Sequence, residues 1–182
     1  MTQQTATKSF IVRDGRDSDI SRITTIYAIE VKEGTASFEL EPPDENEMRR
    51  RFQAIRESGL PYLVAVDAGG HMLGYAYAGP YRTRPAYGAT VEDSVYVADE
   101  ARGRGIGRTL LGELIERCRH AGKREMVAII GDTANRNSIA LHEALGFRLV
   151  GTLRQVGRKH GRWIDTVLMQ LALHHERDDD AG

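Results

Sequence analysis

The chain of 182 residues has a single cysteine, Cys118, so no disulfide can form within it. A chain without disulfides is typical of a reducing compartment, and we expect a cytoplasmic protein. No apolar run approaches the ~20 residues that a membrane-spanning helix needs, and residues 1–9 lack the apolar middle of a signal peptide. The sequence therefore predicts no membrane partner.

An excess of charge of one sign is also missing. The chain carries 25 Lys and Arg residues against 26 Asp and Glu residues, a formal net charge of −1. This balance gives no general attraction to nucleic acid, so we expect no nucleic-acid partner and only local charge preferences. With 41% hydrophobic and 28% charged residues, the composition is that of a globular domain. We expect one domain over residues 10–173, between loose tails at 1–9 and at the charged segment 174–182.

The apolar pattern predicts alternating strands and helices. Strands are expected at residues 10–13, 62–66, 72–78, 90–97, 126–130, 147–153 and 163–173. Helices are expected from Asp17 or Ser18 through Tyr27, around 48–55, over 106–118, and from Asn135 or Asn137 to 145. Residues 79–89 hold two prolines and two glycines and should form a loop. This order predicts an α/β (α+β) fold whose mixed, mostly antiparallel central sheet is flanked by helices.

A glycine-rich turn precedes the helix at 106–118 and reads Arg102-Gly103-Arg104-Gly105-Ile106-Gly107. Glycines let the backbone approach a ligand, and a helix N-terminus offers free N–H groups, so the turn suits phosphates. A dinucleotide fingerprint is excluded because Arg108 and Leu110 stand where small residues are needed. A P-loop is excluded because no Gly-Lys-Ser/Thr ending follows. On glycines alone, a tight turn without a ligand stays an alternative.

The turn is similar to the acetyl-CoA pyrophosphate loop of the GNAT superfamily, Arg/Gln-x-x-Gly-x-Gly/Ala. A second family element follows at 135–147, with its Asn, short helix and Leu-Gly-Phe ending. The resemblance covers roughly residues 10–173 and implies a GNAT-type N-acetyltransferase that uses acetyl-CoA and no metal. The implied cofactor contacts are main-chain groups of Val95, Tyr96 and Val97 for the pantetheine arm, residues Gly103, Arg104, Gly105, Ile106, Gly107 and Arg108 for the pyrophosphate, and Asn135, which is alternatively only an N-cap.

Within the superfamily, the chain most resembles the phosphinothricin and methionine sulfoximine acetyltransferase branch. The resemblance rests on segments 34–38, 82–87, 90–97, 141–147 and 156–163, several of them outside the cofactor turn. It implies a homodimer and a small acidic, amino-acid-like acceptor whose amino group is acetylated. Arginine forks suit carboxylate or phosphinate oxygens, although loop arginines are alternatively plain surface residues. The implied acceptor contacts are Arg82, Arg84, Tyr87, Phe38 and, in an expected loop at 157–162, Lys159.

Acetyl transfer to an amine requires a base that removes the ammonium proton. The resemblance implies that Glu92, in the motif Thr-Val-Glu, is this base; it is alternatively a solvent-facing strand residue. His142 stands where many family members carry the tyrosine that reprotonates the leaving thiolate. It could donate that proton, orient the substrate, or be a partly buried helix histidine. A zinc-protease helix is excluded because Gly146 stands where a second histidine is needed.

Two other functions stay open at this level. A protein N-terminal acetyltransferase would need an open groove, which the loop at 79–89 is long enough to help close. A non-catalytic acyl-CoA-binding regulatory module is the second, and the presence of both Glu92 and His142 speaks against it. The basic residues expected near the acceptor argue against cationic acceptors such as polyamines. Cys118 lies on an apolar helix stripe, which favours direct transfer in a ternary complex over an acetyl-cysteine intermediate.

Overall fold

The computed structural model describes residues 10–174. The tail expected at 1–9 lies outside the described residues, and of the tail expected at 174–182 only His174 is described. No helix in the described part is long and apolar enough to cross a membrane. The strands are β1 (Phe10–Asp14), β2 (Tyr62–Asp67), β3 (Met72–Pro80), β4 (Thr90–Val97), β5 (Glu125–Gly131), β6 (Arg148–Lys159) and β7 (Arg162–Ala172). The helices are α1 (Ile20–Glu33), α2 (Glu45–Glu57), α3 (Ile106–His120) and α4 (Arg136–Glu143).

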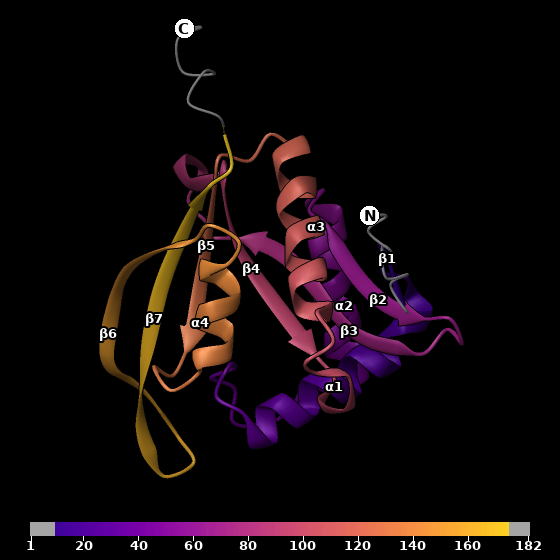
Figure 1. Ribbon diagram of the computed structural model, residues 1–182, viewed down its shortest axis with the longest axis horizontal. Coiled ribbons are helices and arrows are strands. Elements are labelled where there is room, and N and C mark those ends of the chain that lie inside the picture. Colours follow the sequence, from indigo (N-terminus) through magenta and orange to yellow (C-terminus); the bar gives the residue numbers. More distant parts are fainter. Residues whose placement is uncertain (1–9, 175–182) are drawn as a thin grey trace, which may run out of the picture.

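Within residues 10–174 the seven strands form one sheet in the order β1-β2-β3-β4-β5-β7-β6 (Figure 1). Only β4 and β5 pair in parallel, and all other neighbours are antiparallel. The predicted mixed, mostly antiparallel sheet with flanking helices is therefore confirmed. In Figure 1, α3 and α4 lie in front of the sheet. The reverse face carries a layer of stacked tyrosines, Tyr62, Tyr75, Tyr77 and Tyr96, against α1 and α2.

Helix α3 shows how the sequence pattern builds the core. All six residues of its predicted apolar stripe are buried: Ile106, Leu110, Leu111, Leu114, Ile115 and Cys118. Burial of each aliphatic side chain stabilises the fold by about 1.5–3 kcal/mol. Gly74 on β3 has no side chain on this face, where a Cβ would stand 3.4 Å from Leu110 Cδ1 and 2.7 Å from the Tyr96 carbonyl oxygen. The helix therefore packs closely against the sheet next to β4.

The C-terminal hairpin departs from the prediction. The strand expected at 147–153 continues as β6 to Lys159, and the loop expected at 157–162 is wrong. Lys159 pairs with Arg162 across a two-residue turn in which His160 and Gly161 have φ of 50° and 75°. Two residues with positive φ form the turn whose twist matches that of a hairpin, so the strands continue right up to it. The loop expected at 79–89 is also shorter, because β3 extends to Pro80 and a 3-10 turn spans Pro85–Tyr87.

Candidate active site

The cleft lies where β4 and β5 separate. Their parallel pairing covers only three residue pairs and ends at Glu92 and Val127. Beyond this point β5 continues with β7 while β4 continues with β3, which leaves an opening between the two halves of the sheet. A cleft of about 1330 Å³ occupies the opening and is lined by α1, the segment Gly34–Glu39, β4, the glycine turn, β5 and α4.

Main-chain groups of β4 face this opening. The amide of Ala98 donates to the carbonyl of Leu73 on β3, and along an antiparallel strand the direction of these groups alternates. Ser94 and Tyr96 therefore direct their main chain to β3, whereas Val95 and Val97 direct theirs to the open side. Val95, Tyr96 and Val97 all line the cleft.

The glycine turn lies at the cleft margin. Gly103 and Gly105 have φ of 75° and 77°, a conformation that favours glycine, and Gly105 is the N-cap of α3. The first N–H groups of a helix have no partner within it, so the N-terminus of α3 offers donors and a positive dipole end. Gly103, Gly105, Ile106, Gly107 and Arg108 line the cleft, whereas the exposed Arg104 does not.

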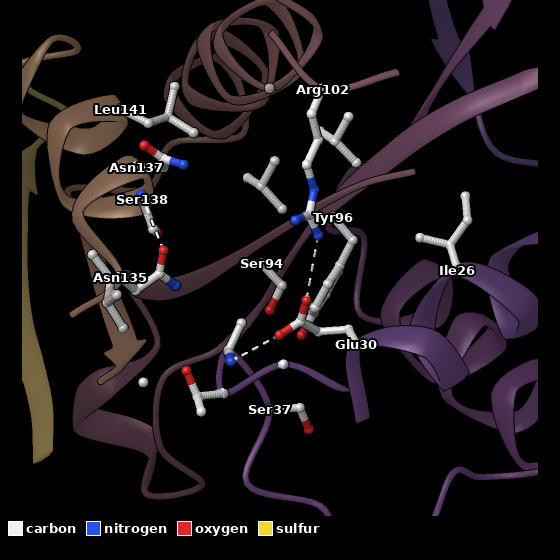
Figure 2. Close-up of a pocket in the computed structure, with 18 of the residues that line it drawn as sticks. Ile26, Glu30, Ser37, Ser94, Tyr96, Arg102, Asn135, Asn137, Ser138 and Leu141 are labelled. Atoms are coloured by element: carbon white, nitrogen blue, oxygen red, sulfur yellow. Dashed lines mark hydrogen bonds and ion pairs between the residues drawn. The ribbon is translucent and has the colours of Figure 1, made fainter. Parts of the chain in front are cut away.

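Asn135 stands opposite, at the N-terminus of α4. Its Oδ1 accepts a hydrogen bond of 3.3 Å from the amide of Ser138, which makes it the N-cap that was one of its two expected roles. Figure 2 shows that the side-chain nitrogen of Asn135 points away from this bond. Since Asn135 also lines the cleft, the amide group remains a donor there.

Glu30 joins the glycine turn to the segment Gly34–Glu39, and sequence reasoning missed it (Figure 2). Its Oε2 lies 3.8 Å from Arg102, which also pairs with Asp99 at 2.8 Å. Its Oε1 accepts a hydrogen bond of 2.9 Å from the amide of Ala36. No sequence spacing reveals this link, because it depends on how α1 crosses the opening.

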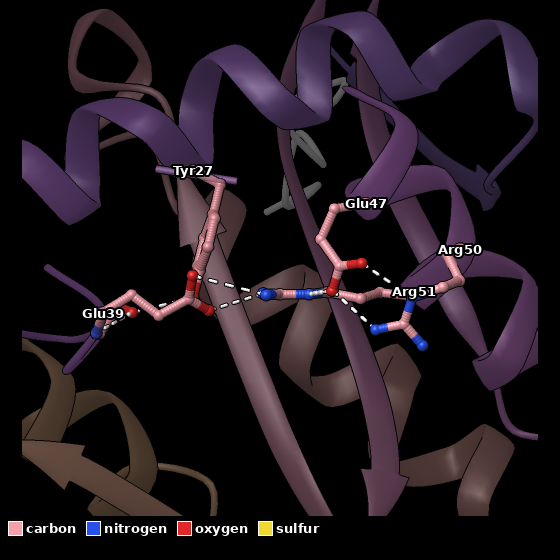
Figure 3. A network of polar contacts seen from close by, with 6 residues as sticks. Tyr27, Glu39, Glu47, Arg50 and Arg51 are labelled. Carbon is pink, nitrogen blue, oxygen red and sulfur yellow. Dashed lines mark hydrogen bonds and ion pairs between the residues drawn. The ribbon is translucent and has the colours of Figure 1, made fainter. Parts of the chain in front are cut away.

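A second polar network holds the same segment from the side of α2 (Figure 3). The hydroxyl of Tyr27 lies 2.8 Å from Ser37 Oγ and donates to Glu39 at 2.9 Å. Arg51 donates to Glu39 at 2.6 Å and to Glu47 at 2.7 Å. The segment is therefore fixed at both ends.

Glu92, the expected base, is half-buried in the cleft wall. Burial raises its pKa above the ordinary value, the neighbouring charge of Asp93 raises it further, and Arg82 opposes the shift. A carboxylate with a raised pKa accepts a proton more readily near neutral pH than an exposed one. The structure thus puts a carboxyl group of raised pKa at the point where the strands separate.

His142 makes a contact that sequence reasoning missed. Its Nε2 lies 3.0 Å from Oδ2 of Asp93 and its Nδ1 lies 2.7 Å from the carbonyl oxygen of Ser138. Burial lowers the pKa of His142, but the hydrogen bond and charge of Asp93 outweigh it, so the pKa is raised. Asp93 shares one face of β4 with Val91, and an aspartate on an apolar face was the available signal.

The residues expected at the acceptor are only partly brought together. Phe38 lines the cleft, whereas Arg82, Arg84 and Tyr87 are exposed and outside its lining, with Arg82 stacked 4.5 Å from the centre of the Tyr81 ring. Lys159 is also outside the lining.

Lys159 instead supports the cleft wall from behind. It is 3% exposed and donates a 2.6 Å hydrogen bond to the carbonyl of Ser37. Arg162, its partner across the hairpin, does line the cleft and is paired with Asp132. Arg162 belongs to the basic stretch at 157–162 that was expected to approach the acceptor site, whereas Asp132 was not expected there.

Comparison with known proteins agrees with this geometry. A model of the Acetyltransferase (GNAT) family matches residues 23–147. The phosphinothricin N-acetyltransferase of Alcaligenes faecalis is 55% identical over 163 residues, which cover 90% of this chain and 82% of that protein. The L-methionine sulfoximine/L-methionine sulfone acetyltransferase of Pseudomonas paraeruginosa is 44% identical, covering 91% of this chain and 96% of that protein.

A solved structure has the same fold. The GNAT superfamily phosphinothricin acetyltransferase from Sinorhizobium meliloti, determined in complex with acetyl-CoA, superposes with a TM-score of 0.88. It is 49% identical and covers 90% of this chain and 88% of that one. The family match includes both the glycine turn and α4, which form two walls of the cleft. The chain belongs to the acetyltransferase (GNAT) family.

Proposed function

We propose that this enzyme transfers the acetyl group of acetyl-CoA to the amino group of a small acidic amino acid such as phosphinothricin, methionine sulfoximine or a related glutamate analogue. The observation that carries the proposal is Glu92, a half-buried carboxylate of raised pKa in the cleft wall where β4 leaves β5. The names of the two relatives supply the acceptor class.

The cleft fits acetyl-CoA by its donor set. The α3 N-terminus and the positive-φ glycines suit the diphosphate, through residues 103–108. The outward main chain of Val95 and Val97 suits the amide groups of the pantetheine arm, as an added strand would, and Asn135 offers one more donor. Gly107 leaves space for a ligand at this wall of the cleft, because an added Cβ would already contact Leu141 at 3.4 Å. Acetyl-CoA supplies the activated acetyl group.

Glu92 acts as the general base in this proposal. An amino group near neutral pH carries a proton that prevents attack, and Glu92 accepts this proton directly or through one water. Direct transfer is favoured because Cys118 cannot serve as a nucleophile. Burial, together with the charge of Asp93, raises the pKa of Cys118 to about 12, and its side chain is completely buried.

The acceptor's acidic group requires a cation, and Arg82 is the favoured one. Its charge lowers the pKa of Glu92, so it lies near the proposed base. Arg162 is a second cation in the cleft lining, although Asp132 partly neutralises it. Arg84, Tyr87 and Lys159 have weaker support as acceptor contacts.

We further propose a cytoplasmic homodimer. The β6–β7 hairpin exposes large apolar side chains, Leu149, Val150, Leu153, Val156 and Trp163, of which Leu149 is 64% and Trp163 59% exposed. An apolar group of this size on an edge hairpin is typical of a protein–protein interface. The lone buried cysteine fits a reducing compartment.

Glu92→Gln tests the proposal. Turnover is followed as free thiol with phosphinothricin, methionine sulfoximine, glutamate and an N-terminal peptide as acceptors. We expect kcat for the acidic amino acids to fall by about 10²–10⁴-fold, with the acetyl-CoA Kd unchanged in calorimetry. Glu125→Gln, a carboxylate on β5 that binds Gln170 away from the cleft, is the matched control. Retention of most of kcat in Glu92→Gln, or preference for the peptide, would contradict the proposal.

A further inference from the structure

Asp93 and His142 form a buried pair for which the proposed chemistry has so far no use. His142 is 4% exposed and Asp93 is 7% exposed, and both lie beside the cleft. Their 3.0 Å contact joins residues that are 49 positions apart. Asp93 is the first residue after the last β4–β5 pair, so the contact ties α4 to β4 across the opening.

The geometry fixes where the protons are. The Ser138 carbonyl can only accept, so the proton of this bond is on His142 Nδ1. A neutral ring would then present the lone pair of Nε2 to the carboxylate of Asp93, which is also an acceptor. A second proton must therefore lie between Nε2 and Oδ2. His142 has no free lone pair and cannot be a base.

We propose that Asp93 is a positioning residue that keeps His142 as an imidazolium, the acid of the proposed reaction. This inference rests on the proposed function. Glu92 holds the proton lost by the acceptor's ammonium group, and His142 holds another at Nε2. The acceptor nitrogen forms its bond to the acetyl carbon and releases its second proton to solvent water, and the Nε2 proton passes to the sulfur as the C–S bond breaks. The Nε2 lone pair of the neutral ring then faces the unchanged Asp93 carboxylate, so the ring takes up a proton from solvent before the next turnover.

The surroundings of the pair support this assignment. The Asp93 carboxylate contacts His142 through Oδ2, whereas its Oδ1 has no hydrogen-bond partner among the described residues. Two other titratable groups are nearby. One is Glu92, whose pKa the charge of Asp93 raises, and the other is Cys118 on α3, whose thiol is kept neutral by burial. On β5, against which α4 packs, Glu125 is occupied by Gln170. The rings of His142 and Phe147 are in edge contact, with their centroids 4.9 Å apart. Phe147 adds no charge near the pair.

Asp93→Asn separates charge from packing. The asparagine amide can donate to Nε2 of a neutral ring while Nδ1 still donates to Ser138, so both hydrogen bonds survive without the extra proton. We expect kcat to fall by about 10²-fold with the acetyl-CoA Kd little changed. Asp67→Asn is the matched control, because Asp67 accepts from the Gly69 and His71 amides in the β2–β3 turn.

The second readout is the protonation state of the His142 ring nitrogens, measured by nitrogen NMR of histidine-labelled protein without substrates. The measurement on the wild type is already informative by itself. Both ring nitrogens of His142 should remain protonated between about pH 6 and pH 8, above the ordinary histidine pKa of ~6.5. In Asp93→Asn, Nε2 should lose its proton in this range, and Asp93→Glu should partly restore it. A neutral His142 ring in the wild type, or Asp93→Asn with unchanged kcat, would overturn the proposal. Glu92→Gln inactivates without changing these signals, so the two proposals fail separately.

Discussion

Gly131→Ala tests how closely β5 approaches the segment Gly34–Glu39. A Cβ built on Gly131 would lie 1.9 Å from the carbonyl oxygen of Thr35 and 3.4 Å from the Phe38 ring. The φ of Gly131 is ordinary, so the alanine is strained only by this contact. Since carbon atoms rarely approach within 3.0 Å, one segment must move by about 1 Å. The Glu30, Lys159 and Tyr27 bonds hold the segment in place and oppose that movement.

Overpacking of this kind costs about 1–3 kcal/mol. For a domain of this size, that lowers the melting temperature by about 2–12 °C. Because the displaced segment lines the cleft, kcat/KM should also fall by about 10- to 100-fold. Both are measured by thermal unfolding and steady-state turnover.

Gly112→Ala on α3 is the matched control. No atom lies within 4 Å of its added Cβ, and alanine in a helix should stabilise the protein by about 0.5–1 kcal/mol. If Gly131→Ala melts and turns over like the wild type, the segment is not packed against β5 as described, and the reasoning is refuted.

Three further predictions follow from single residues. Gly105→Ala puts a side chain at a φ of 77°, so unfolding free energy should drop by about 1–2 kcal/mol and calorimetry should show weaker acetyl-CoA binding. The buried Cys118, with its pKa raised to about 12, should react with a thiol reagent only after denaturation; rapid labelling of native protein would contradict this. Burial raises the pKa of Glu92, so its ionised form costs stability above that pKa. Glu92→Gln should therefore melt above the wild type at neutral pH and lose this advantage as the pH falls through the Glu92 pKa.

Most of the fold, and the elements of the cofactor half of the site, could be predicted from local sequence patterns. The stripe of α3 and the glycine turn can be predicted because their determinants are adjacent in sequence. The Asn135 cap is equally local, since its partner Ser138 is three residues away. The roles of Glu92 and His142 came from resemblance and stay predictions.

The acceptor half could not be predicted in the same way. Lys159 was expected to contact the acceptor, yet it is outside the cleft lining and donates to the carbonyl of Ser37, 122 positions away. A basic residue in sequence does not reveal whether the fold buries its amine or leaves it for a ligand. Asp93 shows the same problem, because its partner is known only when α4 is placed beside β4.

The short β4–β5 pairing has a consequence for hydrogen exchange. The main-chain amides of Val95 and Val97 face the opening, so they have no strand beside them on that side. Without a ligand they should exchange with deuterium much faster than the amides of Ser94 and Tyr96, which face β3. A cofactor that adds itself as a strand would protect the exposed pair alone, and it would also join the two halves of the sheet. At 100 times its Kd such a ligand stabilises the folded state by about 2.7 kcal/mol. Hydrogen exchange at the amides of Val95 and Val97 would therefore report whether the cofactor is bound.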